Sequence, residues 1–222
     1  LSFGLFLKAG PLEIQLKPEH HFAENLDFDG FWEGHYDEIW EKRYVGWNRS
    51  DIPERFGNKR INQNLLGQSS IKFKFKNLSI GFSNENLWWG PSIRNSIMMS
   101  NHARSFKHIS FNTSKPINTR IGSIEWQFVT GRLELSGHPP PASDRIFRGR
   151  KLWVPEHNQA RFGPDWRYFQ GMIFTYNPKW LKNFYVGTIR WAQLYRGFLE
   201  GEYDWFDQRP GYFPLFSGLF KT

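Results

Sequence analysis

The sequence predicts an all-β protein, an antiparallel transmembrane β-barrel with long polar loops. Several segments alternate apolar and polar residues, which is the pattern of a strand with one apolar and one wet face. Aromatic residues make up 18% of the 222 residues although the mean hydropathy is −0.61. Lipid-facing strands with aromatic girdles produce that combination. Short turns also alternate with long polar stretches, as they do in membrane barrels.

The composition alone leaves one alternative open, an aromatic-rich soluble β-sandwich or jelly roll. A helical membrane protein is excluded, because no apolar run approaches the roughly 18 residues that a membrane helix requires. The chain has no cysteine, which excludes disulfides, thiolate metal sites and cysteine nucleophiles together.

The clearest strands lie in the first half of the chain. Residues 12–16 alternate apolar and polar side chains, and residues 71–76 repeat the pattern. The alternation resumes after Asn77 and continues over residues 78–83. Two such strands with a polar joint predict a hairpin or one long bent strand.

Three lysines share one face of the strand predicted at 71–76: Lys72, Lys74 and Lys76. If the apolar residues of this strand face lipid, the lysines face the lumen of the barrel. There they would either follow an acidic polymer or pair with carboxylates on neighbouring strands, such as Glu13 and Glu125.

The second half of the chain predicts longer aromatic strands. Residues 124–128 alternate, and the phase slips near Gly131, which predicts a β-bulge. Residues 166–176 and 184–195 form two further strands, and the asparagine, proline and lysine at 177–179 supply the turn between them.

Long polar stretches separate these strands. Residues 24–67 are dense in charged and aromatic side chains, and residues 37–44 read as one or two helical turns. Residues 137–163 contain three prolines at 139–141 that forbid regular strand pairing there. The same stretch carries a basic cluster that would either meet a polyanion or remain a solvated loop: Arg145, Arg148, Arg150 and Lys151.

We expect residues 1–222 to form a single domain, a partial membrane β-barrel, because no domain boundary or internal repeat interrupts the pattern. About eight to ten strands of about 10 residues fit in this length. The first residues read as a strand already under way and not as a signal peptide, while residues 211–222 begin another aromatic strand. We therefore expect the domain to be truncated at both ends.

The most distinctive polar segment, residues 81–101, contains two adjacent tryptophans. A flat indole covers the C–H face of a sugar ring, while amides bind hydroxyls and an arginine pairs with a uronate. The candidate ligand-binding residues are Trp88, Trp89, Asn84, Asn86, Arg94, Asn95 and Asn101. The alternative is that the tryptophans form an interfacial girdle and the asparagines hold turns. Adjacent residues on a strand point in opposite directions, so at most one indole is expected to face a ligand.

The net charge of +8 favours polyanionic partners. Acidic polysaccharide and lipopolysaccharide phosphate are the candidates, whereas no nucleic acid is expected, because no nucleic-acid-binding motif occurs and the basic residues are spread thinly. No cofactor is expected either. His20 and His21 lie near Glu19 and Glu24, but their spacing does not fit a helical metal-binding motif.

Three stretches, GFSNENLWWGP at 81–91, RNSIMMSN at 94–101 and NTSKPINTRIGSIEWQFVTGRLE at 112–134, resemble the capsule assembly protein Wzi family in its Bacteroidetes-type form. The resemblance extends more weakly over residues 14–28, 51–57 and 67–73. One departure is Ser92, which follows Pro91 where many members have glycine.

The resemblance implies an outer-membrane β-barrel about twice as long as this chain. Such a protein holds capsular polysaccharide at the bacterial surface, in a lectin-like manner and without catalysis. The expected partners are a capsular polysaccharide, which we expect to be acidic, outer-membrane lipid and lipopolysaccharide, and the expected state is a monomer.

Two other functions stay open. A porin-like or saccharide-exporting barrel would have the same strand pattern with an open lumen. An envelope glycoside hydrolase would need two carboxylates that flank one glycosidic bond. The sequence offers Glu125 with Glu134, or Asp27 with Asp29, but does not place either pair together.

Overall fold

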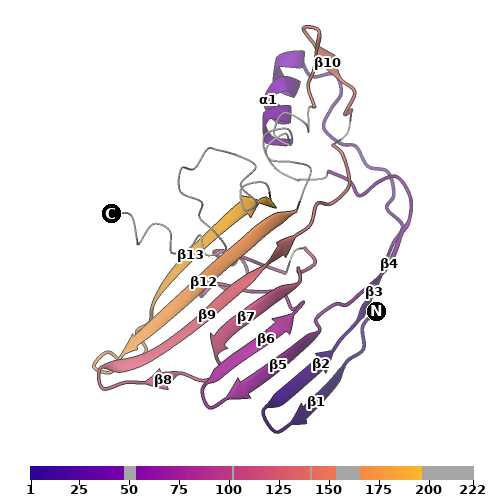
Figure 1. Cartoon of the computed structure of the whole chain (residues 1–222). Coiled ribbons are helices and arrows are strands. Elements are labelled where there is room, and N and C mark those ends of the chain that lie inside the picture. The colour runs from indigo at the N-terminus through magenta and orange to yellow at the C-terminus, as the bar shows by residue number, and fades with distance from the viewer. Residues whose placement is uncertain (48–53, 102, 141, 154–165, 197–222) are drawn as a thin grey trace.

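The computed structural model describes residues 1–47, 54–101, 103–140, 142–153 and 166–196. The strand expected within residues 211–222 lies outside the described residues. Eight strands follow one another across the main sheet in the order β1-β2-β5-β6-β7-β9-β12-β13, and β8 pairs with β9 (Figure 1). Their bounds are β1 Leu5–Ala9, β2 Leu12–Leu16, β5 Ser70–Phe75, β6 Leu78–Ser83, β7 His108–Thr113, β8 Ile117–Asn118, β9 Gly122–Leu133, β12 Arg167–Pro178 and β13 Val186–Tyr195.

Every neighbouring pair in this sheet is antiparallel. The all-β antiparallel prediction is therefore confirmed. Within the described residues the sheet stays open, because β1 and β13 each pair with one neighbour only. No helix in the part of the chain that the structure describes is long and apolar enough to cross a membrane.

The hairpin predicted around Asn77 is confirmed. Phe75 pairs with Leu78, so Lys76 and Asn77 form a two-residue turn between β5 and β6. Lys76 has a positive φ of 53°, as the tight turns of two-residue hairpins require. The third lysine of the predicted ladder therefore lies in the turn and not on the strand.

One face of the sheet is apolar and open to the surroundings. Phe73 of β5 pairs with Ile80 of β6, and Ile80 pairs with Phe111 of β7, so the three side chains lie in one row. The row continues to Phe128 of β9. Phe73 is 49% exposed and Ile80 is 52% exposed. A contiguous exposed apolar face of this kind is typical of a surface that lies against an apolar environment.

The opposite face, here called the wet face, is polar. Lys72 and Lys74 lie on it, between residues of the apolar face, as the alternation predicted. Lys74 forms an ion pair with Glu13 of β2 at 2.6 Å, and Lys8 of β1 approaches the same carboxylate at 3.4 Å. The sequence left two roles open for the lysines, following an acidic polymer or pairing with a carboxylate on a neighbouring strand. Lys74 has the second role.

The bulge predicted near Gly131 is wrong. Residues of β9 pair with β12 in unbroken register from Gly122 to Leu133, and β7 pairs with β9 without an extra residue. A Cβ atom at Gly131 would lie 2.5 Å from the carbonyl oxygen of Lys107 and 2.8 Å from the ring of Phe106. Glycine is needed there because another part of the chain passes close to the strand.

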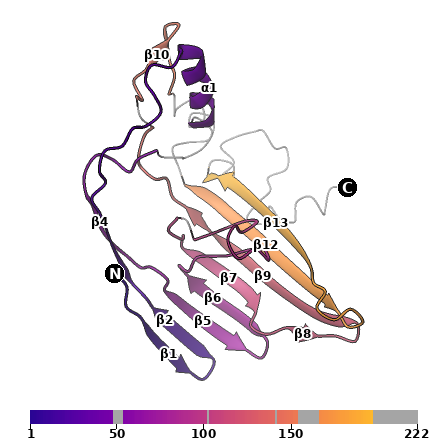
Figure 2. The same ribbon diagram turned by 180° about the vertical axis from the view of Figure 1, so that it is seen from behind.

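The long connections from β2 to β5 and from β9 to β12 form a smaller unit beyond the end of the sheet (Figures 1 and 2). It contains a two-stranded ribbon of β3 (Glu19–Ala23) and β4 (Ile61–Leu65), helix α1 (Asp37–Trp47) and the short hairpin of β10 (Ile146–Phe147) and β11 (Arg150–Lys151). The helical turns predicted at 37–44 are confirmed and extend to Trp47.

Residues 31–47 and 142–153, here called the cap, share their own core. Trp40 and Tyr44 of α1 are buried against Leu152. Arg145 binds Asp37 at 3.2 Å and lies over the ring of Trp40, with its guanidinium carbon 4.5 Å from the ring centroid. Part of the basic cluster predicted from the sequence therefore holds the cap together.

Candidate functional site

The connection from β6 to β7, described over residues 84–101 and 103–107, folds back over the wet face of the sheet (Figure 2). We call it the inserted segment. Its residues Leu87 and Trp89 form a buried core with Val129 of β9 and Phe169 of β12. Because these partners come from strands on the far side of β7, the segment crosses several strands of the sheet.

Trp89 is the deepest anchor of the inserted segment. The side chain is 1% exposed, and its indole Nε1 donates a hydrogen bond to Oε1 of Gln127 at 2.7 Å. The ring lies against Gly171 of β12, where an added Cβ would meet the indole at 2.6 Å. A buried indole with its polar atom satisfied is a packing element, and it presents no ring face to a ligand.

A short hairpin within the segment holds Trp89 in place. The backbone N–H of Trp89 donates to the carbonyl oxygen of Met98 at 3.1 Å, and the N–H of Ile97 donates to the carbonyl oxygen of Trp89 at 3.1 Å. Gly90 follows with a positive φ of 122°, which glycine adopts without strain. The turn after the two tryptophans is therefore set by this hairpin.

Glu85 is the second anchor. Its carboxylate forms an ion pair with Lys72 of β5 and accepts hydrogen bonds from Gln15 Nε2, Ser70 Oγ and Ser83 Oγ, each at 3.1 Å. Burial alone would raise the pKa of Glu85, but Lys72 and the two serine hydroxyls outweigh it and hold the pKa below its ordinary value. A charged glutamate therefore ties the start of the segment to the wet face.

The return leg of the segment is tied to its start. Ser105 Oγ donates to the carbonyl oxygen of Glu85 at 2.6 Å. His108, the first residue of β7, is buried, and its Nδ1 lies 2.8 Å from the carbonyl oxygen of Phe106. The bond from Ser105 to Glu85 places residues 103–107 beside residues 84–88 at one end of the sheet.

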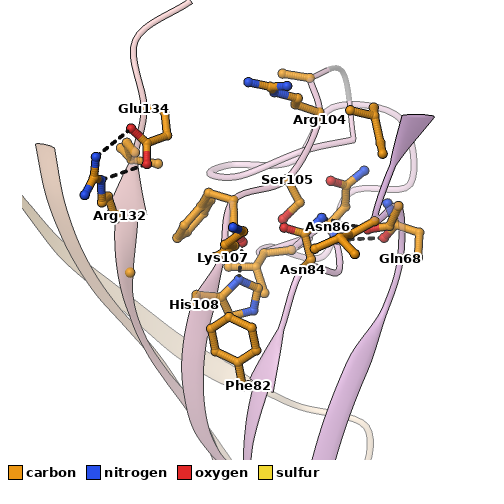
Figure 3. A pocket seen from close by; sticks show the side chains of 18 of the residues that line it. Gln68, Phe82, Asn84, Asn86, Arg104, Ser105, Lys107, His108, Arg132 and Glu134 are labelled. Atoms are coloured by element: carbon orange, nitrogen blue, oxygen red, sulfur yellow. Dashed lines mark hydrogen bonds and ion pairs between the residues drawn. The ribbon is translucent and has the colours of Figure 1, made fainter. Parts of the chain in front are cut away.

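A cavity of about 1510 Å³ opens at this end of the sheet (Figure 3). Its lining comes from the β3–β4 ribbon, the connection from β4 to β5, the two legs of the inserted segment, and the neighbouring ends of β6, β7, β9 and β12. Its volume exceeds that of pockets for small ligands, which have about 300–1,000 Å³. The space is sufficient for several units of a polymer.

Four of the candidate residues line this cavity: Asn84, Asn86, Trp88 and Asn101. Nδ2 of Asn84 donates to the carbonyl oxygen of Gly67 at 2.9 Å. The backbone N–H of Asn86 donates to Gln68 Oε1 at 2.7 Å, whereas the side-chain oxygen of Asn86 has no hydrogen-bond partner among the described residues. Trp88 is 37% exposed, and its Nε1 donates to the carbonyl oxygen of Ser92 at 2.8 Å, so the ring is held in place.

The other three candidates do not line the cavity. Trp89 is buried beneath it, as described above, because its indole packs between the segment and the sheet. Arg94 and Asn95 are exposed in the turn that the bridge between Trp89 and Met98 closes, and the N–H of Asn95 donates to Ser92 Oγ at 3.2 Å. The structure thus separates the seven residues into a cavity group and a turn group, with Trp89 as an anchor.

Sequence reasoning missed the basic and aromatic residues at the cavity's other walls. Arg104, Lys107, Arg132, Trp166 and Arg167 line it. The guanidinium carbon of Arg132 lies 4.9 Å from the centroid of the Trp166 ring. These residues stand at strand ends and in the return leg, far apart in sequence, so no local pattern brings them together.

The histidines of the β3–β4 ribbon have polar partners. His20 Nδ1 lies 2.8 Å from Asn64 Oδ1, and His21 Nε2 lies 3.1 Å from Glu19 Oε2. Among the described residues, no group of three or more histidine, aspartate or glutamate side chains is arranged to hold a metal ion.

An antiparallel sheet that exposes an apolar face, and whose polar face is covered by its own inserted segment, has the architecture of a β-barrel wall. The family model of the capsule assembly protein Wzi matches residues 14–193. The chain belongs to this family, as the resemblance of residues 81–134 indicated. No curated protein and no solved structure matches the sequence.

Proposed function

We propose that this protein binds capsular polysaccharide in the cavity beside the inserted segment and thereby supports capsule assembly or attachment at the outer membrane. The observation that carries the proposal is the cavity itself. A tryptophan and three asparagines, Trp88, Asn84, Asn86 and Asn101, line a space large enough for several sugar units. An indole face binds the C–H face of a pyranose, and amides bind its hydroxyls.

The exposed apolar face supports the outer-membrane location and contact with lipid and lipopolysaccharide. Rows such as Phe73, Ile80 and Phe111 cover the strands on the side away from the inserted segment. We further propose that the chain forms one domain, part of a larger monomeric barrel. The edges of β1 and β13, which have one neighbour each among the described residues, support this, because strand edges exposed to lipid leave backbone groups without hydrogen bonds.

A binding role without catalysis agrees best with the carboxylates. Glu125 and Glu134 are nine residues apart on and just beyond β9, about 30 Å at about 3.3 Å per residue. The two carboxylates of a glycosidase lie about 5–10 Å apart. Asp27 is ion-paired with Arg55, and neither Asp27 nor Asp29 lines the cavity.

An open porin or exporter is the second candidate, and the inserted segment argues against it. Residues anchored by Glu85 and Trp89 occupy the wet face, where a pore would need free space. Single-channel recording in planar bilayers should therefore give little conductance. Conductance like that of an open porin would favour the transport function.

The binding proposal is tested by the retention of purified capsular polysaccharide on the folded protein. Trp88→Ala and Asn101→Ala should each weaken retention, because each removes a side chain that lines the cavity. Trp180→Ala and Asn95→Ala are the matched controls. Trp180 is 67% exposed in the turn after β12 and, like Asn95, does not line the cavity. Equal retention by all four variants and the unaltered protein would overturn the proposed site.

A further inference from the structure

We infer that the cavity contains a carboxylate-binding subsite formed by Arg104, Lys107 and Arg167, which takes an acidic sugar unit of the polymer. This inference rests on the proposed polysaccharide-binding function and adds the chemical class of the ligand. None of the three residues belongs to the group nominated from the sequence. The arginine nominated there, Arg94, lies outside the cavity.

Of the acidic residues that line the cavity, one is neutralised by an arginine. Two glutamates line the cavity, Glu19 and Glu134. Glu19 lies 3.1 Å from the ring of His21. Glu134 binds the guanidinium of Arg132 through both oxygens, at 2.7 and 3.1 Å. Glu134 therefore does not offset the charge of the remaining three cations, which outnumber the single charge of Glu19.

Three cations of the cavity have no acidic partner. Within the described part of the chain, no carboxylate lies at ion-pair distance from Arg104, Lys107 or Arg167. The guanidinium of Arg167 faces the side-chain amide of Gln193, whose oxygen accepts at 2.9 and 3.1 Å in the favoured amide orientation. A neutral amide orients this guanidinium without cancelling its charge.

The three cations come from two parts of the chain that the fold brings to one cavity. Arg104 and Lys107 lie in the return leg of the inserted segment, and Arg167 is the first residue of β12. In Figure 3, Lys107 lies between the Arg132–Glu134 pair and the asparagines, with Arg104 above them. Arg104 and Lys107 are exposed, so their charged groups are accessible from the cavity.

This arrangement favours a carboxylated sugar over a neutral one. A guanidinium fork binds both oxygens of a carboxylate, and a lysine adds a point charge. The hydroxyls of a neutral polymer would obtain little binding free energy from three cations without acidic partners. A uronate carboxylate would serve as the acidic partner that these cations lack. Asparagines of the neighbouring leg of the inserted segment line the same cavity, where they can bind hydroxyls.

The test uses two probes that differ only in charge. One is a tetrasaccharide of alternating glucose and glucuronic acid, and the other is the same tetrasaccharide after reduction of its carboxyl groups. The folded protein should bind the acidic probe at least about tenfold more tightly, because a carboxylate forms charge-assisted hydrogen bonds that the reduced probe cannot form. This preference should shrink as the salt concentration rises.

The double variant Arg104→Gln/Lys107→Gln should lose that preference and still bind the reduced probe as before. Arg94→Gln is the control, because it removes an equal charge type from the same segment outside the cavity. A phosphorylated tetrasaccharide forms the third arm, and tighter binding of it than of the uronate would overturn the assignment to carboxylate.

The outcomes separate the two proposals. If both probes bind equally and the double variant changes nothing, the subsite is refuted, while a loss of binding in Trp88→Ala still supports the proposed function. If neither probe nor the capsular polymer binds, both proposals fail. Circular dichroism of each variant shows whether it has folded.

Discussion

The indole of Trp89 occupies the space that a side chain at Gly171 would fill. An added Cβ at Gly171 would lie 2.6 Å from the indole and 3.0 Å from the ring of Phe169. The glycine in β12 and the tryptophan in the inserted segment, 82 positions apart in the chain, therefore depend on each other. This contact decides whether the segment can lie on the sheet.

Gly171→Ala should loosen the inserted segment. The added methyl group must displace Trp89 or Phe169, and overpacking of a core costs about 1–3 kcal/mol. Proteolysis within residues 90–101 should become faster than in the unaltered protein. Gly187→Ala is the matched control in the neighbouring strand, because its Cβ would meet only ordinary contacts at 3.6 and 3.7 Å. Equal protection in both variants would contradict the role of the glycine.

Trp89→Phe should destabilise the protein less than Trp89→Ala, yet measurably. Phenylalanine keeps most of the buried ring but leaves Gln127 Oε1 without the 2.7 Å hydrogen bond, which costs about 1–3 kcal/mol. Truncation to alanine leaves a cavity and costs about 3–5 kcal/mol. Denaturant unfolding followed by fluorescence measures both. The double variant Trp89→Phe/Gln127→Leu should recover part of the loss if the hydrogen bond is the cause.

The attachment of the segment should weaken in acid. The pKa of Glu85 in the folded protein is held below its ordinary value, so the stability that its charge contributes is present above the unfolded pKa of about 4.3. That stability is lost as the pH falls through the folded pKa. Protease protection of residues 90–101 should therefore decrease as the pH falls from 5 to 3, because a carboxyl group with a lowered pKa becomes protonated over about this range.

Glu85→Gln is the control for that pH dependence. It should reduce protection already at pH 7, because Lys72 loses its partner, and the remaining protection should change little between pH 5 and pH 3. If the glutamine variant shows the same acid transition as the unaltered protein, another group causes it.

A charged side chain on the apolar face should cost more folding free energy in lipid than one on the wet face. Phe111→Lys places a lysine in the row that we assign to lipid, at a cost of about 2–4 kcal/mol near the midplane of the bilayer. Asn112→Lys, the next residue of β7, places the same charge on the opposite face. Folding into lipid vesicles should fail or slow only for Phe111→Lys. Equal folding of both variants would argue against lipid contact.

The strands were predictable because alternation is a local signal. The alternation in residues 71–83 predicted the hairpin, its turn and the placement of Lys72 and Lys74 on the wet face, because a period of two assigns each residue to one face. Gly131 was misinterpreted for the same reason. A local pattern reports an interruption, but the cause is the approach of Lys107 and Phe106 from another part of the chain.

The candidate site was predictable only in part. The polar character of residues 81–101 identified the segment, and four of its side chains line the cavity. The direction in which the segment folds depends on Gly171 and Gln127, which lie in strands far along the chain, so the sequence could not assign Trp88 and Trp89 their different positions. Arg104 and Arg167 carry no pattern of their own, and only the folded molecule brings them to the same cavity.

The two anchors of the inserted segment also fix the distance across the sheet between β5 and β12. Glu85 and Trp89 are four residues apart, but Glu85 reaches Gln15 and Lys72 on one side, while Trp89 reaches the glycine of β12 on the other. Any change in strand tilt that widened this span would break one of the two attachments. A few side chains of the inserted segment thus constrain the curvature of the sheet. A homologue with a wider or narrower sheet would need an inserted segment of different length.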